Sequence, residues 1–306
     1  MRDHVMVFAP APVLSVTIEQ QADVLELHLH AGGQGIWQAR MISSLGVRVV
    51  LCAAVGGEVG AVLGRALEDE ELELRMVPRK SSSGWYVHDR REGSRSEIAE
   101  NPGAPLIRHD IDELYGLALA EGMRAAVSVL SGPAHPSVVD DDVYRRLASD
   151  LRANGSQVVA DLSGGQLAAV LGGGVSFLKV SHEEVIEAGR AADDSVDALS
   201  RAAHQLRADG AEAVLISRAE KPALALLDDD LVEVRVPQLE IVDHRGAGDS
   251  MTAGVAAVLT RGGSLEEAVR TGAAAGAVNV TRHGLGTGRA EAVRELIGRV
   301  RLTPLD

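Results

Sequence analysis

Short apolar runs alternate with longer amphipathic segments through the middle of the chain, and this alternation constrains the fold more than any other feature. The runs at 125–131, 157–161, 176–180 and 213–217 have the length of buried strands, and the segments between them have the length of helices. Strands that alternate with helices in this way form a parallel sheet with helices on both faces. Ligands of such sheets bind at the ends of the strands, so we expect the functional site there.

A glycine pair late in the chain, Gly246 and Gly248 with Ala247 between them, predicts an anion site. The glycines allow a sharp turn that exposes successive N–H groups. The Ala-rich helix predicted over 250–260 places these groups at a helix N-terminus, where the dipole favours negative charge. Asp249 follows at once. A carboxylate beside bound phosphate is repulsive unless it takes the proton of a hydroxyl that attacks the phosphate. The alternative is an ordinary helix cap without a ligand.

Two glycine-rich blocks, one early and one late, resemble those of the PfkB-type, or ribokinase-like, sugar kinases. The early block covers residues 30–37 and the late block residues 243–250. Shorter motifs of the family have counterparts between the blocks, in the same order, at 98–103, 131–133, 161–164 and 179–184. The similarity extends over about residues 5–300. The pattern is closest to the branch of 1-phosphofructokinase and tagatose-6-phosphate kinase.

The resemblance implies a ribokinase-like α/β fold: a three-layer sandwich with a mostly parallel sheet and a small β-sheet lid, in one domain over residues 1–306. It also implies an ATP-dependent phosphotransferase that uses Mg²⁺ and acts on a hydroxyl of a sugar or sugar-like alcohol. Asp249 would be the base. The N–H groups of Gly246, Ala247 and Gly248 would stabilise the charge on the transferred phosphoryl group.

The resemblance assigns further residues to ligands and to the lid. Nucleotide contacts are assigned to Lys179, Ser181, Glu184, Ser217, Glu220 and Arg245, and Glu184 would also hold Mg²⁺ through water. Acceptor contacts are assigned to Gly32, Gly33, Gln34, Trp37 and Asp249. An exposed sheet formed by about residues 13–30 and 78–101 would be the lid. Apolar side chains on such a sheet need a cover, which a second subunit provides in relatives, so we expect a homodimer that pairs through the lid.

Departures from the family pattern gather on the acceptor side. Gln34 stands where the family has lysine, Trp37 where it has asparagine, and serines 81–83 where it offers an arginine to a sugar phosphate. A phosphomonoester buried without cationic partners costs several kcal/mol. We therefore expect fructose 1-phosphate, fructose 6-phosphate and tagatose 6-phosphate to be poor substrates. Cations close enough in sequence to replace the missing ones are Arg79, Lys80, Arg90 and Arg91.

Two alternatives to a sugar kinase stay open. The altered acceptor residues would also suit a catalytically impaired protein that binds a ligand and regulates another process, although an intact Asp249 weighs against this reading. Trp37 offers a flat apolar face that suits a base as well as a sugar ring, which would fit a nucleoside kinase.

Composition argues against some classes of partner. The net charge of −14 argues against a nucleic-acid groove. No apolar run reaches the ~18 residues of a membrane span, and the first residues lack the charge pattern of a signal peptide, so we expect a cytoplasmic protein. Cys52 lies in an apolar run and is expected to be a buried, inert thiol. His28 and His30 share one strand face, but without a third ligand nearby we expect no metal there.

Some secondary-structure predictions rest on short segments. The mostly apolar residues 239–242 predict a strand that leads into the late glycine block. The glycines at 56, 57 and 60 predict a turn over 56–60, followed by a helix over 61–70. Helices predicted over 265–282 and 290–300 close the chain.

Overall fold

A ten-stranded sheet runs through the part of the chain that the computed structural model describes, residues 2–70, 72–92, 95–282 and 284–305. Its strand order is β14-β13-β12-β11-β10-β9-β8-β1-β4-β5. Neighbours from β11 to β5 are parallel, and β12, β13 and β14 extend the sheet antiparallel. The bounds are β1 His4–Phe8, β4 Arg48–Gly56, β5 Glu73–Arg79, β8 Val127–Ser131, β9 Gln157–Asp161, β10 Val175–Ser181, β11 Ala211–Arg218, β12 Lys221–Leu227, β13 Asp230–Arg235 and β14 Arg301–Pro304.

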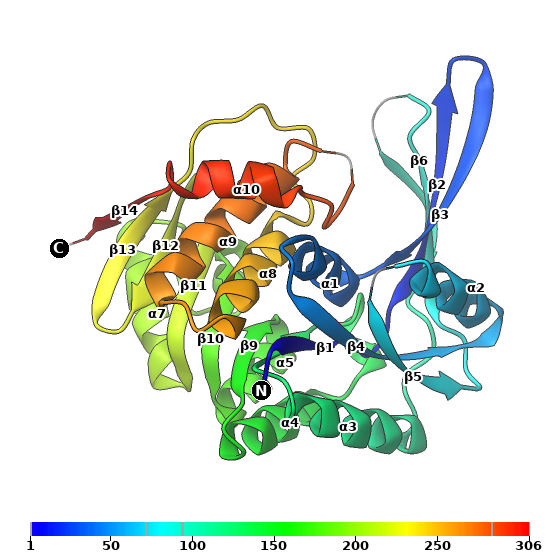
Figure 1. The fold of residues 1–306 in the computed structure, drawn as a ribbon, viewed down its shortest axis with the longest axis horizontal. Helices are drawn as coiled ribbons and strands as arrows, with labels where there is room; N and C mark the ends of the chain where they lie inside the picture. The colour runs from blue at the N-terminus through cyan, green and yellow to red at the C-terminus, as the bar shows by residue number, and fades with distance from the viewer. Residues whose placement is uncertain (1, 71, 93–94, 283, 306) are drawn as a thin grey trace.

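Helices cover both faces of this sheet and complete the three-layer sandwich that the resemblance implied (Figure 1). One face carries α1 Gln34–Ser44, α2 Gly57–Glu68, α8 Ala247–Thr260, α9 Leu265–Asn279 and α10 Ala290–Ile297. The other carries α3 Arg108–Gly122, α4 Asp141–Ala153, α5 Gly164–Gly173, α6 His182–Glu187 and α7 Val196–Ala208, with the short 3₁₀ helix η1 Pro136–Val138. Because strand side chains alternate, Val5 and Val7 join the first core, and Met6 and Phe8 join the second.

A smaller sheet stands to one side of this body and is called the lid below (Figure 1). Its order is β3-β2-β6-β7, with β2 Val13–Gln21, β3 Val24–Gly32, β6 Gly84–Asp89 and β7 Ser96–Asn101. Residues of β3 with apolar side chains alternate with histidines, so the lid has one apolar and one polar face. Leu25, Leu27 and Leu29 are exposed, whereas His28 and His30 line a cavity on the polar side.

Two of the predicted elements are wrong. Residues 239–242 form no strand: the loop crosses the end of α9, and the N–H groups of Val242 and Asp243 donate to the Val280 carbonyl. The predicted turn over 56–60 is helical from Gly57 onward, because α2 begins directly after β4. A β-carbon on Gly56 would lie 2.1 Å from the Arg79 carbonyl oxygen, so the glycine here serves close packing and not a turn.

The register of the parallel strands brings polar residues together at one edge. Ser131 pairs with Asp161 across β8 and β9, and Asp161 pairs with Lys179 across β9 and β10. These are strand-end positions, where α/β sheets bind ligands. Among the described residues, no helix is long and apolar enough to cross a membrane.

Candidate active site

The first turn of α8 contains the glycine pair for which an anion cradle is predicted. Gly246 caps the helix in the left-handed region, with a φ of 71°, which a β-carbon would strain. The next N–H groups have no partner within the helix and point out of its positive end. A β-carbon on Gly248 would lie 2.4 Å from Nζ of Lys179, so the glycine is what allows this ammonium to approach the turn.

Asp249 sits in the same turn, buried, within a hydrogen-bonded cluster. Nε2 of Gln38 donates to Oδ1 of Asp249 at 3.3 Å and to Oδ2 of Asp161 at 3.2 Å. Oδ2 of Asp161 also accepts from the Thr252 hydroxyl at 2.7 Å, and Lys179 Nζ lies 3.3 Å from Oδ1 of Asp161. Two buried carboxylates therefore share one amide, and one of them also pairs with the Lys179 ammonium.

Burial, together with the nearby Asp161 carboxylate, raises the pKa of Asp249 to about 8, although Lys179 and the Gln38 hydrogen bond act in the opposite direction. For Lys179, burial opposes the charge, but Asp161, Glu184 and Asp249 outweigh it, and the net pKa shift is upward. Lys179 thus stays an ammonium at neutral pH, while Asp249 titrates near the pH at which an enzyme works. A carboxylate of this kind can both take and return a proton.

A pocket of 480 Å³ opens beside Asp249, between the body and the polar face of the lid, and is called the acceptor pocket below. Its volume is in the usual range for small-molecule sites. The body supplies Gly33, Gln34, Trp37, Gly132, Glu184 and Asp249, among others, and the lid supplies Val13, Tyr86, His88, Arg95, Glu97 and Glu100.

The lid side of the acceptor pocket carries both signs of charge. Arg95 lies over the Tyr86 ring, with Cζ 5.3 Å from the centroid, and contacts Nε2 of His88. Burial, helped by nearby guanidinium groups, lowers the pKa of His88 to about 4, so this histidine is neutral at pH 7. Within the described residues, Arg95 forms an ion pair with no carboxylate, and neither Glu97 nor Glu100 pairs with a cation.

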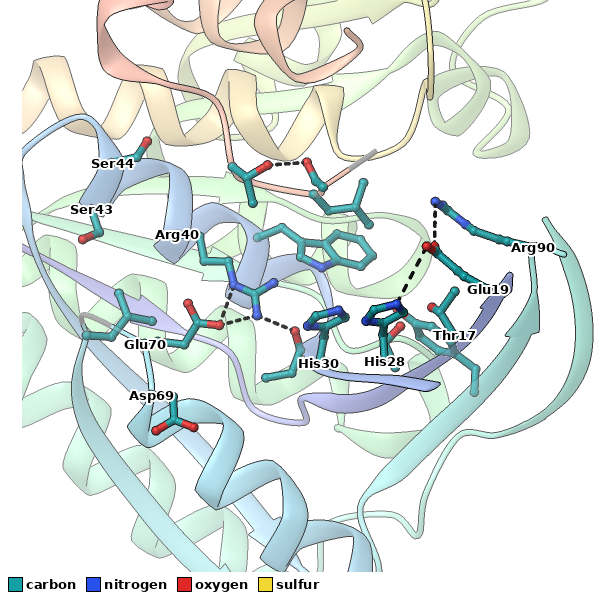
Figure 2. Close-up of a pocket in the computed structure, with 18 of the residues that line it drawn as sticks. Thr17, Glu19, His28, His30, Arg40, Ser43, Ser44, Asp69, Glu70 and Arg90 are labelled. Carbon is teal, nitrogen blue, oxygen red and sulfur yellow. Dashed lines mark hydrogen bonds and ion pairs between the residues drawn. The ribbon is translucent and has the colours of Figure 1, made fainter. Parts of the chain in front are cut away.

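A second cavity of 670 Å³, called the lid cavity below, lies farther along the polar face of the lid (Figure 2). Figure 2 shows His28 and His30 side by side on its floor, with Arg40 bonded to Glu70 on one flank and Arg90 facing Glu19 on the other. Asp249 does not line it. The two cavities share Trp37, Tyr86 and Arg95 as lining residues, so these side chains divide one space under the lid.

Most of the residues assigned to the acceptor lie around one pocket. Gly33, Gln34 and Trp37 line the acceptor pocket, and Gly32 ends β3 close to the Tyr86 hydroxyl. Oε1 of Gln34 accepts from the Gly132 N–H at 2.7 Å, which ties the early glycine block to the end of β8. The side-chain oxygen of Gln34, which stands where the family has lysine, is thus already bonded within the protein.

The residues assigned to the nucleotide are more scattered. Ser181 and Glu184 form a capping box at the start of α6, with the Ser181 N–H bonded to Oε2 of Glu184 at 2.7 Å. Ser217 lies beside Ser181 in the sheet. Glu220 lies in the exposed turn between β11 and β12 and lines neither cavity. Arg245 is bonded through Nη2 to Oδ2 of Asp243 at 3.1 Å, not extended into open space.

None of the three arginines that could have replaced the missing cations lines the acceptor pocket. Arg79 is buried and donates to the carbonyls of Ala104 and Ser82, and Arg91 pairs with Asp89. Arg90 pairs with Asp243 at 3.2 Å. Lys80 does not line the pocket either. Arg95 takes the place that these residues were expected to fill, and no motif pointed to it.

Gln38 is the second residue that the motifs did not reveal. It lies four residues after Gln34 and therefore on the same face of α1, which is the sequence signal that could have found it. In the described part of the chain, no group of three or more His, Cys, Asp and Glu side chains could hold a metal ion. His28 and His30 stack at 6.1 Å, and Cys52 is buried with its pKa raised to about 12 by burial.

Comparison with known proteins identifies relatives over nearly the whole chain. The model of a family described as pfkB family carbohydrate kinase matches residues 3–292. A 1-phosphofructokinase of Bacillus subtilis strain 168 is 29% identical over 276 residues, which cover 90% of this chain and 89% of that protein.

Solved structures that are similar to this chain include a phosphofructokinase and a ribokinase. Phosphofructokinase-2 from Escherichia coli in complex with fructose-6-phosphate matches with a TM-score of 0.84 at 25% identity, over 97% of this chain and 99% of that one. The same enzyme has been solved as an inhibited tetramer. Arabidopsis thaliana ribokinase complexed with ribose and ATP matches with a TM-score of 0.75 at 20% identity, over 97% and 99% of the two chains. This last likeness shows the ribokinase-like fold.

Proposed function

Because the chain belongs to the pfkB family of carbohydrate kinases, we propose that it transfers the terminal phosphoryl group of ATP to a hydroxyl of a sugar or sugar-like alcohol. The main support for the proposal is that a buried carboxyl group, Asp249, lines the acceptor pocket from the first turn of α8, where the anion cradle is predicted. A carboxylate in that place is repulsive to phosphate and is useful as a base.

Asp249 accepts the proton of the acceptor hydroxyl, whose oxygen then attacks the terminal phosphorus as the bond to the ADP oxygen breaks. Its pKa of about 8 supports this role, because proton transfer is most efficient when the pKa of the base is near the working pH. The N–H groups of Gly246, Ala247 and Gly248 stabilise the negative charge on the phosphoryl oxygens, with the dipole of α8 behind them. Lys179, next to Gly248, adds a full positive charge.

The residues around the cradle fit a nucleotide and its metal. When bound, ATP supplies the phosphoryl group, and Mg²⁺ neutralises part of the phosphate charge. Lys179, Ser217 and Arg245 are the donors on this side, with Ser181 next to them. Glu184 lines the acceptor pocket while one of its oxygens is held by Ser181, so its other oxygen can hold Mg²⁺ through water.

The acceptor is a non-phosphorylated sugar, polyol or nucleoside. Among the described residues, the acceptor pocket offers one guanidinium, Arg95, against two carboxylates that pair with no cation, Glu97 and Glu100, which favours hydroxyl groups over a phosphomonoester. Trp37 adds a flat face for the C–H side of a ring. The B. subtilis and E. coli relatives are named as phosphofructokinases, and the difference in substrate rests on these residues of this chain. The adjoining lid cavity gives room for an acceptor larger than one ring.

A non-catalytic binding protein is the weaker candidate. Asp249 lines the acceptor pocket from the first turn of α8, near Lys179, and a protein that only bound nucleotide would gain nothing from a carboxylate beside the phosphate. The chain acts as a homodimer that pairs through the lid, and its use of ATP suits a cytoplasmic location.

A panel of acceptors with ATP and Mg²⁺ tests this function. ADP formation is measured with free sugars, polyols and nucleosides, and with fructose 1-phosphate, fructose 6-phosphate and tagatose 6-phosphate. We expect the best kcat/KM from a non-phosphorylated acceptor. Turnover of a phosphosugar at about 10⁴ M⁻¹s⁻¹ or better, as in ordinary enzymes, would return the chain to the phosphofructokinase group. Absence of turnover on every acceptor would favour the binding protein.

A further inference from the structure

A buried glutamine bridges the two carboxylates of the active site. Gln38 is fully buried on α1, and its Nε2 reaches Asp249 and Asp161 at 3.3 and 3.2 Å. Its Oε1 accepts from the Ser131 hydroxyl. Every polar atom of this side chain is therefore bonded. A buried amide costs free energy unless it is satisfied in this way, and a satisfied amide holds its partners in one arrangement.

The surroundings determine which way the amide points. The reverse orientation would turn Oε1 toward two carboxylates, where an acceptor meets acceptors and repulsion results. The Ser131 hydroxyl, itself fully buried, supplies the donor that Oε1 needs. The NH₂ group is thus directed at Asp161 and Asp249 by the hydrogen bond on its other side.

The contact uses one oxygen of Asp249. Oδ1 accepts from Gln38, and within the described residues no group donates to Oδ2. We propose that Gln38 is a positioning residue: it fixes the carboxylate of Asp249 beside Asp161 and leaves the second oxygen free for the acceptor hydroxyl. This inference rests on the proposed function, in which Asp249 is the base.

The charged groups that face Asp249 explain why its carboxylate needs a positioning residue. Asp161 on β9 and Glu184 on α6 repel its charge, and Lys179 on β10 attracts it. Lys179 is held against Asp161, at 3.3 Å, so it does not by itself direct Asp249 toward the acceptor. The Gln38 amide favours the ionised form of Asp249. Because a hydrogen bond is directional, it also orients the carboxylate, which the charge of Lys179 alone does not.

The test compares Gln38→Met, which keeps length and volume but removes the donors, with wild type on the best acceptor of the panel. We expect kcat at pH 7 to fall about tenfold or more, since small displacements of a catalytic group have large effects on rate. KM for ATP should stay within about twofold, because the cradle is untouched. The midpoint of the kcat–pH profile should move upward, because the ionised base has lost a donor.

Three further variants make the result unambiguous. Ser128→Ala removes another fully buried hydroxyl of β8, one bonded to Ser156 and lining neither cavity, and should leave the pH midpoint at the wild-type value. Ser131→Ala removes the hydroxyl that orients Gln38 without adding volume, and should move the midpoint in the same direction as Gln38→Met, with a smaller loss of kcat. If Gln38→Met does not fold, Ser131→Ala decides the matter alone.

Asp249→Asn separates the two levels of the proposal. If this variant stays active, the base assignment itself is wrong. If it is inactive while Gln38→Met and Ser131→Ala keep the wild-type kcat and pH midpoint, the base stands and the positioning role of Gln38 is overturned.

Discussion

At Asp249, replacement by asparagine keeps the shape of the side chain and removes the base. General-base contributions are typically ~10²–10⁴-fold, so kcat of Asp249→Asn should fall by at least about a hundredfold. ATP affinity should stay the same or rise, because a negative charge beside the phosphates is gone. Initial rates and ATP titrations on the best acceptor measure both effects.

A second buried aspartate provides the matched control. Asp110 on α3 is as buried as Asp249 and lines neither cavity, so Asp110→Asn should keep kcat within about threefold of wild type. Turnover by Asp249→Asn above about a tenth of the wild-type rate would contradict the base assignment.

The raised pKa of Asp249 also predicts a pH dependence of stability. The folded protein holds this proton up to about pH 8, whereas the unfolded chain loses it near 3.8. The folded state thus binds more protons between these values, and its stability falls as pH rises through that window, by at most about 1.4 kcal/mol per pH unit for one proton.

Asp249→Asn lacks the group, so its melting temperature should fall less than that of wild type between pH 5 and pH 8. Thermal melts of both proteins across that range test this difference. Parallel pH curves would show that Asp249 is ionised in the folded protein throughout.

Sequence predicts residue positions most directly where the backbone itself is part of the motif. Gly246, Gly248 and Asp249 form one continuous turn, so their order in the sequence fixes their geometry. Gln38 and Arg95 reach the site from α1 and from the start of β7, and their roles depend on tertiary contacts with Asp161 and Tyr86. A pattern within one segment cannot show such contacts.

At the scale of elements, the lid hairpin of β6 and β7 determines which charged side chains face a substrate in the acceptor pocket. Arg95 is its one guanidinium among the described lining residues. Arg95→Gln should leave kcat/KM for a non-phosphorylated acceptor within about threefold. Any residual activity on phosphosugars should fall about tenfold or more, because a desolvated cation near phosphate is lost.

Arg91→Gln is the control, since Arg91 lies on the same hairpin but pairs with Asp89 away from the pocket. Steady-state kinetics on one acceptor of each class provide the comparison. If Arg95→Gln lost activity on the non-phosphorylated acceptor and not on a phosphosugar, the assignment of Arg95 as the anion-facing group would be wrong.

Each element that the sequence missed or predicted wrongly has its own physical reason. β12 begins with Lys221-Pro222, which is typical of a turn, and proline is tolerated there at the start of a strand. β14 is four residues long at the sheet edge, too short for a period of two. Leu239, Ile241 and Val242 are apolar and yet exposed, so hydrophobicity alone predicted a strand where the described chain forms a loop.

For the whole molecule, the apolar face of the lid remains to be covered. Leu25, Leu27 and Leu29 are all exposed there. A sheet that presents a row of large apolar side chains to water is a typical protein–protein contact. The E. coli relative, solved as a tetramer, shows that this family can assemble. We therefore predict a homodimer that pairs through this face, with a mass of about twice the 32.1 kDa of one chain.

Light scattering at micromolar concentration measures the mass, and one substitution locates the interface. Leu27→Glu places a charge at the centre of the apolar face, where burial in a dimer would be costly, and should shift the population to monomer. Ile107→Glu makes the same change at a residue of similar exposure, 61% against 63%, just before α3 and away from the lid, and should leave the dimer intact. A 32.1 kDa species for the wild type would contradict the dimer, and a dimer that survives Leu27→Glu would place the contact elsewhere. The kinetics of the monomeric variant then show whether the acceptor pocket, which is built partly from the lid, depends on the partner subunit to hold the lid in place.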